Sequence, residues 1–159
     1  MLIGVISDSH DDMEQISKAV TLINQRKATH VIHAGDLVSP FTFEVLGGLD
    51  CPFTGIFGNN DGDHVLLKEK SEGRLFIQPH MIELNGRFIA IVHEPIAVEA
   101  LALSGKYDVV IHGHTHIPYT KKEERALVIN PGKLARLHKG KSTMVFLDLA
   151  ALEAEIVEL

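Results

Sequence analysis

Short apolar runs recur along the chain, and several of them stop abruptly at polar residues. The clearest run is residues 109–111, Val-Val-Ile, which are β-branched and too few for a core helix, so they predict a buried strand. This run leads directly into His112. The same change from apolar to polar follows residues 1–6 and 30–33. The pattern therefore predicts buried strands whose ends carry polar side chains.

Helix-like segments separate the strand-like runs in the first half of the chain. Asp11 or Asp12 can cap a helix that closes at polar residues 25–27. Its apolar stripe, at the spacing typical of an amphipathic helix, consists of Ile16, Ala19, Val20 and Ile23. Residues 39–46 predict a second helix, since they begin with Ser-Pro and are followed by Gly-Gly.

Hairpin signals dominate the second half of the chain. Asn85-Gly86 stands between strand-like residues 81–84 and 88–92, and Asn-Gly is the strongest short hairpin signal. The other expected elements are strands over 52–57 and 127–129, helices over 65–72 and 97–103, and a closing hairpin of 143–149 and 153–157. Strands that alternate with helices favour a parallel sheet, and hairpins add antiparallel pairs. The sequence therefore predicts an α/β fold with mixed sheets.

Length and composition favour one soluble globular domain over residues 1–159, with 45% hydrophobic and 23% charged residues. Cys51 is the only cysteine, which excludes an intrachain disulfide and suggests a reducing compartment. The start of the chain lacks the basic region of a signal peptide, and no apolar stretch approaches the ~20 residues of a membrane span. We therefore expect a cytoplasmic protein without a membrane partner. Its oligomeric state stays open, a homo-oligomer included.

The net charge of −6 argues against a long nucleic-acid partner, because such partners require a basic face. A small anionic substrate is compatible with this charge if metal ions supply local positive charge.

Five successive apolar runs end in potential metal ligands, and ligands in open α/β sheets bind beyond the carboxyl ends of strands. These residues are Asp8, His10, Asp36, Asn59, His93, His114 and His116. Taken singly, each has an ordinary structural explanation: an aspartate can cap a helix, Asn59 can occupy a left-handed turn, and a histidine can bond to a backbone carbonyl. Together, seven nitrogen or oxygen ligands exceed one tetrahedral site and suit two adjacent divalent ions that share a carboxylate. Two such ions typically serve phosphate-ester hydrolysis.

These motifs, in this order, resemble those of the calcineurin-like metallophosphoesterases, and most closely the small prokaryotic YfcE-like phosphodiesterases. They are Asp8-Ser9-His10, Gly35-Asp36, Gly58-Asn59-Asn60-Asp61, His93, Gly113-His114-Thr115-His116 and the turn Asn130-Pro131-Gly132. The resemblance spans essentially the whole chain. It implies a four-layer αββα sandwich of two mixed β-sheets flanked by helices.

The resemblance also implies the roles of the ligands. Asp36 would bridge two ions; Asp8, His10 and His116 would complete one site, and Asn59, His93 and His114 the other. The expected ions are Mn²⁺, with Ni²⁺, Fe²⁺ or Zn²⁺ as alternatives. The expected reaction is hydrolysis of a small phosphodiester by a hydroxide that bridges the two metals.

Two residues depart from the family pattern. Many relatives have histidine where this chain has Asn60, which can bind a phosphate oxygen but cannot act as a general acid. Glu94 replaces a common glycine and could crowd the second site or add negative charge there.

Three further residues are weaker candidates for the site. Asp61 is a candidate catalytic residue that could orient Asn60 or instead cap a helix. His112 is a candidate substrate-binding residue, with a packed strand residue as the equal alternative, and Lys133 is compatible with an ordinary solvated side chain. No sequence argument makes ligands of the other histidines, His30, His33, His64, His80 and His138.

We expect a metal-dependent phosphodiesterase on these grounds. The main alternative is a non-catalytic, metal-binding protein-interaction scaffold similar to the retromer subunit of this fold. The complete set of seven ligands argues against that alternative. A nuclease similar to the DNA-repair members of the superfamily is disfavoured by the negative charge and the lack of a large additional domain.

Overall fold

The computed structural model describes residues 1–136 and 140–159, so His138 lies outside the described residues. The first sheet combines four parallel strands with an antiparallel pair at one side, in the order β11-β10-β1-β2-β3-β4. Its strands are β1 (Leu2–Ile6), β2 (His30–His33), β3 (Phe53–Ile56), β4 (Leu75–Phe76), β10 (Thr143–Asp148) and β11 (Glu153–Glu158). The closing hairpin, β10 and β11, thus lies beside the first strand of the chain.

The second sheet has the order β5-β6-β7-β9-β8, and it too is mixed, with β6, β7 and β9 parallel and both edge strands antiparallel. Its strands are β5 (His80–Leu84), β6 (Arg87–Ile91), β7 (Val109–Ile111), β8 (Tyr119–Glu123) and β9 (Ala126–Asn130). The Asn85-Gly86 hairpin between β5 and β6 is confirmed.

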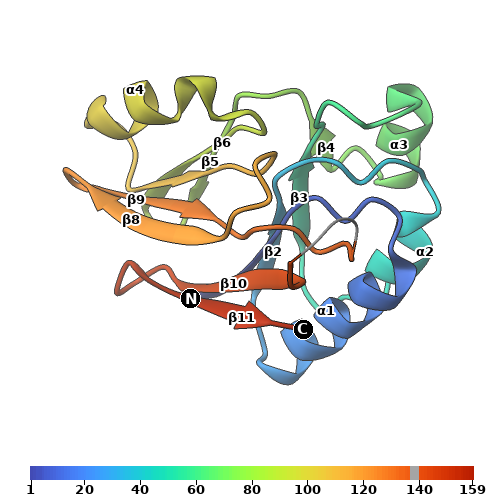
Figure 1. Cartoon of the computed structure of the whole chain (residues 1–159). Helices are drawn as coiled ribbons and strands as arrows, with labels where there is room; N and C mark the ends of the chain where they lie inside the picture. The colour runs from blue at the N-terminus through green and yellow to red at the C-terminus, as the bar shows by residue number, and fades with distance from the viewer. Residues whose placement is uncertain (137–139) are drawn as a thin grey trace.

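Helices cover the outer faces of the two sheets (Figure 1). The first sheet carries α1 (Met13–Gln25), α2 (Thr42–Leu46) and α3 (His64–Lys70), and the second carries the short 3-10 helix η1 (Pro95–Ala97) with α4 (Val98–Leu103). Three apolar layers hold these parts together. In β2, Val31 faces the helices, and Ile32 faces the second sheet. This alternation builds the four-layer αββα sandwich, as predicted.

The structure corrects some local expectations. The second helix begins at Thr42, because the Ser39 hydroxyl donates to the Asp11 carboxylate (2.9 Å) and does not cap the helix. Strands β4 and β8 were not predicted, since one is very short and the other is mostly exposed and polar.

Asp12 caps α1 by accepting a hydrogen bond from Gln15 N. Among the described residues, no helix is long and apolar enough to cross a membrane.

Candidate metal centre

The seven predicted ligands lie at the carboxyl ends of five parallel strands drawn from both sheets. The first sheet supplies the residues after β1, β2 and β3, which are Asp8, His10, Asp36 and Asn59. The second sheet supplies the residues after β6 and β7, which are His93, His114 and His116. The predicted convergence of these loops at one edge is therefore observed.

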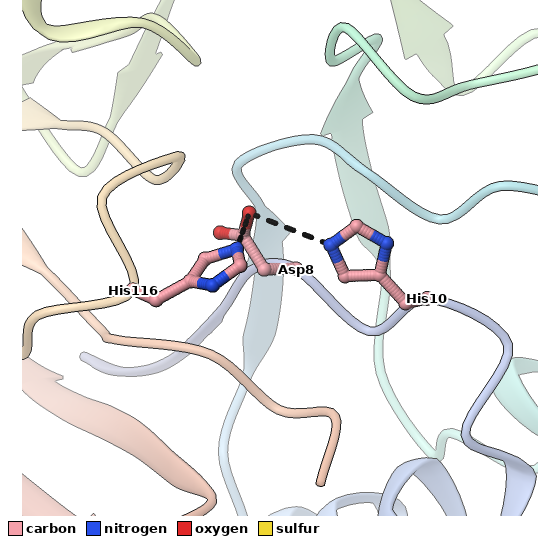
Figure 2. A group of neighbouring side chains, drawn as sticks. All are labelled: Asp8, His10 and His116. Atoms are coloured by element: carbon pink, nitrogen blue, oxygen red, sulfur yellow. Dashed lines mark hydrogen bonds and ion pairs between the residues drawn. The ribbon is translucent and has the colours of Figure 1, made fainter. Parts of the chain in front are cut away.

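Asp8, His10 and His116 form a first cluster (Figure 2). Asp8 Oδ1 lies 3.1 Å from His116 Nε2 and 3.9 Å from His10 Nε2. The other oxygen of Asp8 accepts hydrogen bonds from the Ser7 hydroxyl (2.5 Å) and from the backbone N–H of His114 (3.1 Å). These two bonds fix the carboxylate so that Oδ1 faces both imidazoles.

Asn59, His93 and His114 form a second cluster. Asn59 Oδ1 lies 2.9 Å from His93 Nε2 and 2.8 Å from His114 Nδ1. His93 Nδ1 lies 2.7 Å from the carbonyl oxygen of Ala34, which can accept its proton. That backbone bond orients the imidazole and leaves Nε2 directed at the centre, the arrangement that metal-ligating histidines usually adopt.

Asp36 lies between the two clusters. Its Oδ2 atom is 3.6 Å from His10 Nε2 and 3.4 Å from His93 Nε2. Asn60 donates to both of its oxygens, from the backbone N–H to Oδ1 and from Nδ2 to Oδ2, each at 2.8 Å. Burial opposes ionisation of this carboxyl, but the hydrogen bonds from His93 and Asn60 outweigh it and hold the pKa of Asp36 below its usual range. One carboxylate oxygen thus faces a histidine from each cluster.

The charge of the buried carboxylates also affects His93. Burial alone lowers the pKa of this imidazole, but the adjacent Asp36 carboxylate and the Ala34 carbonyl reverse the effect and raise the pKa to about 9. Asp8 and Asp36 are 0% and 1% exposed. The centre therefore concentrates negative charge where water is scarce, which favours a cation.

A divalent cation fits this donor set. His10 Nε2 is buried without a hydrogen-bond partner among the described residues, although it points at the oxygens of Asp8 and Asp36. A buried nitrogen in this state is costly unless it has a ligand to bind. The donors are imidazole nitrogens, carboxylate oxygens and one amide oxygen, which suit divalent ions of the first transition series.

The backbone of the centre is strained. Five of the predicted ligands have positive φ angles, a region that non-glycine residues rarely occupy: Asp8 (53°), His10 (39°), Asp36 (61°), His114 (65°) and His116 (59°). Such conformations cost of order 1–3 kcal/mol each and cluster at functional sites. The loops thus adopt an unfavourable backbone that turns these side chains toward a common point.

The remaining sequence candidates have supporting positions. Asp61 accepts backbone hydrogen bonds from Gly58 (2.7 Å), Val38 (2.7 Å) and Asp36 (3.2 Å), so it ties the loop after β3 to the loop after β2. It does not cap α3, because Asp63 does. This geometry favours a positioning role for Asp61 over a catalytic one.

His112 is 2% exposed and has both ring nitrogens engaged. Nε2 lies 2.7 Å from the Tyr119 hydroxyl, and Nδ1 lies 3.0 Å from the Gly113 carbonyl oxygen. The packed alternative that we considered therefore describes this residue better than substrate binding.

Lys133 is buried, with 2% exposure, so the expectation of a solvated side chain is wrong.

Sequence reasoning missed two residues that hold the ligand loops. His33 is fully buried, with Nδ1 accepting from Gly35 N (3.2 Å) and Nε2 lying 3.0 Å from Ser9 Oγ, so it joins the loops that carry Asp36 and His10. Burial lowers the pKa of His33 to about 3, which keeps the ring neutral. Its position directly after the apolar pair Val31-Ile32 and before Ala34-Gly35-Asp36 was the available signal.

Gln78 is the second missed residue. Its Oε1 atom accepts a hydrogen bond from His93 N at 2.6 Å, and its amide nitrogen donates to Glu94. Glu94 therefore turns toward Gln78, and the expected crowding of the second cluster is not observed. No sequence pattern pointed to Gln78, because its contact with His93 depends on how the two sheets meet.

The calcineurin-like phosphoesterase superfamily domain matches residues 1–151. The chain belongs to this superfamily. Phosphodiesterase MJ0936 of Methanocaldococcus jannaschii is 37% identical over 155 residues, covering 93% of each chain. The solved structure of a novel archaeal phosphodiesterase has 34% identity to this phosphoesterase, a TM-score of 0.94 and complete coverage of both chains. The predicted family and the predicted enzyme class are thus confirmed.

Another structural neighbour of this phosphoesterase is Vps29 of Entamoeba histolytica complexed with zinc. It has a TM-score of 0.72 and 18% identity, with 99% of each chain covered. At this identity the likeness concerns the fold alone.

Proposed function

We propose that this phosphoesterase is a binuclear metal-dependent hydrolase of small phosphodiesters. The observation that carries the proposal is the position of Asp36 Oδ2 between His10 and His93, with Asp8 and His116 beside His10 and Asn59 and His114 beside His93. A carboxylate in this position can bridge two cations, whereas a single ion would not need seven donors.

The two ions would be held by separate sets of residues that share Asp36. Asp8, His10 and His116 would complete one set, and Asn59, His93 and His114 the other. When bound, the ions would supply positive charge opposite a phosphoryl group and lower the pKa of water. Mn²⁺ is the first candidate, with Ni²⁺, Fe²⁺ and Zn²⁺ as alternatives.

Asn60 would act on the substrate directly. Its amide nitrogen carries two hydrogens, of which one is donated to Asp36 Oδ2. The other is available to a phosphoryl oxygen, and the bond to Asp36 would keep the amide in the orientation for that contact. Asn60 has no proton to give to a leaving group, so water would protonate the departing oxygen.

The choice of a small substrate rests on charge. The net charge of −6 disfavours a long polyanion, although a small diester can approach cations held at the centre. The alternative of a non-catalytic scaffold has support only from the Vps29 fold, while the complete donor set favours hydrolysis. A cytoplasmic location stays a prediction, and the oligomeric state stays open.

A reconstitution experiment tests the proposal. Protein stripped of metal would be supplied with each of the four ions, and bound metal would be counted by elemental analysis. Turnover would be measured with bis(p-nitrophenyl) phosphate, a cyclic nucleotide and single-stranded DNA. We expect two ions per chain and hydrolysis of the small diesters. One ion per chain at saturation, or faster cleavage of the DNA, would overturn the proposal.

A further inference from the structure

A groove of about 420 Å³ lies between α3 and the segments that follow β3 and β4. We call it the aryl groove, and its lining consists of Phe57, His64, Val65, Lys68, Glu69 and Ile77. Figure 1 shows α3 next to β4 at the side of the first sheet. The groove lies outside the donor set described above.

Two aromatic rings form a flat wall of the groove. The rings of Phe57 and His64 stack with centroids 4.1 Å apart and an interplanar angle of 13°. Phe57 is buried, with 6% exposure, whereas His64 is exposed. A further planar group can therefore stack on the solvent side of His64. Stacked aromatic pairs are more favourable than the burial of their apolar surface alone would make them.

Two large aliphatic side chains of the groove face water. Val65 and Ile77 are 80% and 78% exposed, although Val65 lies in the first turn of α3 and Ile77 directly follows β4. Single exposed apolar residues need no explanation, but here two of them line one groove together with a stacked aromatic pair. Covering them with an apolar ligand would be favourable at roughly 25 cal/mol per Å² of buried apolar surface.

Two segments of the chain relate the groove to the candidate metal centre. Phe57 precedes Asn59 by two residues, and Phe57 N donates to the Phe76 carbonyl oxygen (2.9 Å), which places Ile77 at the same edge of the sheet. Gln78 follows Ile77 and accepts the hydrogen bond from His93 N at 2.6 Å. Phe57 and Ile77, on the two walls of the groove, therefore lie within two residues along the chain of Asn59 and of Gln78, the partner of His93.

We propose that the aryl groove binds a planar aromatic substituent of the phosphodiester, an aryl or heteroaryl ring, while the phosphoryl group lies at the metal centre. The inference rests on the proposed function, because it takes the occupant to be part of the substrate. A planar ring matches the stack and the two aliphatic side chains, whereas a methyl ester would leave them exposed to water. The protein thus selects aromatic diesters over small aliphatic ones.

Binding of two matched anions tests the groove without turnover. Diphenylphosphinate and dimethylphosphinate share the anionic centre of a diester, but their P–C bonds resist hydrolysis. Each would be titrated into the zinc-loaded protein with ¹³C-labelled valine and isoleucine methyl groups. Ring currents should shift the Val65 and Ile77 methyl signals with diphenylphosphinate and leave them in place with dimethylphosphinate. Unshifted signals at saturation would overturn the inference.

Substitutions of groove residues test whether the aromatic ring binds there. Ile77→Ser and Val65→Ser should each weaken diphenylphosphinate binding about 5-fold or more, since they remove apolar surface, and change dimethylphosphinate binding less than 2-fold. Leu103→Ser is the matched control, because Leu103 is 50% exposed at the end of α4, outside the groove, and should change neither Kd. Equal weakening of both anions would contradict a site for the aromatic ring.

The outcomes separate this inference from the proposed function. If diphenylphosphinate occupies the groove but no metal-loaded protein cleaves a diester, the proposed hydrolysis fails and the groove stands as a binding site. If diesters are cleaved but the two phosphinates bind alike, the hydrolysis stands and the inference fails.

A second copy of the chain is the competing occupant of the aryl groove. It would be indicated if Ile77→Ser reduced the molar mass measured by light scattering while both Kd values stayed unchanged.

Discussion

At the scale of single residues, the candidate centre depends on a few side chains whose neighbours direct them. Asp8, Asp36 and His93 each present one atom to the centre and have another atom held by the protein. Such supporting bonds orient ligands and typically affect metal affinity or activity by 10–100-fold when they are lost. The effects of substitutions should therefore extend beyond the ligands themselves.

Asp36→Asn should be the most damaging change to a single ligand, because Asp36 is the residue that faces both clusters. We expect the number of bound metal ions to fall below two per chain and kcat/KM to fall at least about 100-fold. Elemental analysis and steady-state kinetics measure these quantities, with the exposed Asp50→Asn as a control. Two retained ions together with near-normal turnover would show that Asp36 does not bridge.

Asn60→His should add a group that can protonate a leaving group. The unperturbed pKa of histidine is about 6.5, and general acid catalysis typically contributes ~10²–10⁴-fold. We expect the gain to be greatest for diesters with basic leaving groups, so the dependence of log kcat/KM on leaving-group pKa should become shallower. A series of graded diesters measures this slope in both proteins. Equal slopes would mean that residue 60 lies away from the departing oxygen or that another group already acts as the acid.

His33→Leu should destabilise the protein even without metal. The leucine would leave Gly35 N and Ser9 Oγ without their bonds to the imidazole, and a buried group left unsatisfied costs about 1–3 kcal/mol. Urea unfolding in the presence of a chelator measures the change in the free energy of unfolding. His33→Gln offers an acceptor and a donor on a side chain of similar reach and should recover part of the loss.

At the scale of elements, Asp108 links the starts of β6 and β7. Its carboxylate accepts from Phe88 N (3.0 Å) and from Arg87 (3.0 Å), and its own N–H donates to the Phe88 carbonyl (2.8 Å). Burial opposes ionisation, but the bonds from Phe88 and Arg87 outweigh it and lower the pKa of Asp108. The ionised form therefore stabilises the folded state.

This lowered pKa gives a pH-dependent prediction. The stabilisation is present above the unfolded pKa of about 3.9 and is lost as the pH falls through the still lower folded pKa. Asp108→Asn should reduce the free energy of unfolding by about 1–2 kcal/mol at pH 7, since it removes the charge from these hydrogen bonds. Denaturant titrations of both proteins measure the difference in their free energies of unfolding. This difference should be constant from pH 7 to 5 and should become smaller between pH 4 and 3. A difference that grew in acid would contradict this assignment.

Local patterns predicted most elements because burial and periodicity agree in them. The buried strands β1 and β7 and the amphipathic helix α1 follow directly from their apolar residues. Strand β8 could not be predicted in this way, because its sequence Tyr-Thr-Lys-Lys-Glu is polar and its strand conformation comes from pairing with β9. Edge strands of this kind are determined by their partner more than by their own residues.

At the scale of the whole molecule, the predicted ligands could be assembled from sequence because each follows a parallel strand, and such strand ends converge. The positive φ angles of Asp8 and Asp36 could not be predicted, since these residues donate backbone hydrogen bonds to other loops, Asp8 to the Gly35 carbonyl and Asp36 to the Asp61 carboxylate. Gln78 was missed for the same reason. Its role exists only after the linker between β4 and β5 reaches the loop after β6.

Metal binding should stabilise the whole molecule. Ions that bind the folded chain shift the unfolding equilibrium, and at 100 times the Kd the gain is about 2.7 kcal/mol. For a chain of this size that corresponds to a rise in Tm of about 5–10 °C. Thermal scans with and without manganese measure it, and Asp36→Asn should show a smaller rise. An unchanged Tm in the unsubstituted protein would count against a preformed site.

The centre joins both sheets, and this has a consequence for how the protein is made. Asp8 and His116 lie 108 residues apart, yet they are in contact. The sheet that carries Asp8 is completed by β10 and β11, the final strands of the described chain. During synthesis, the early donors therefore emerge long before their partners and before the strands that complete their sheet. The capacity to capture an ion is thus a property of the finished chain, and a nascent chain would acquire it only late.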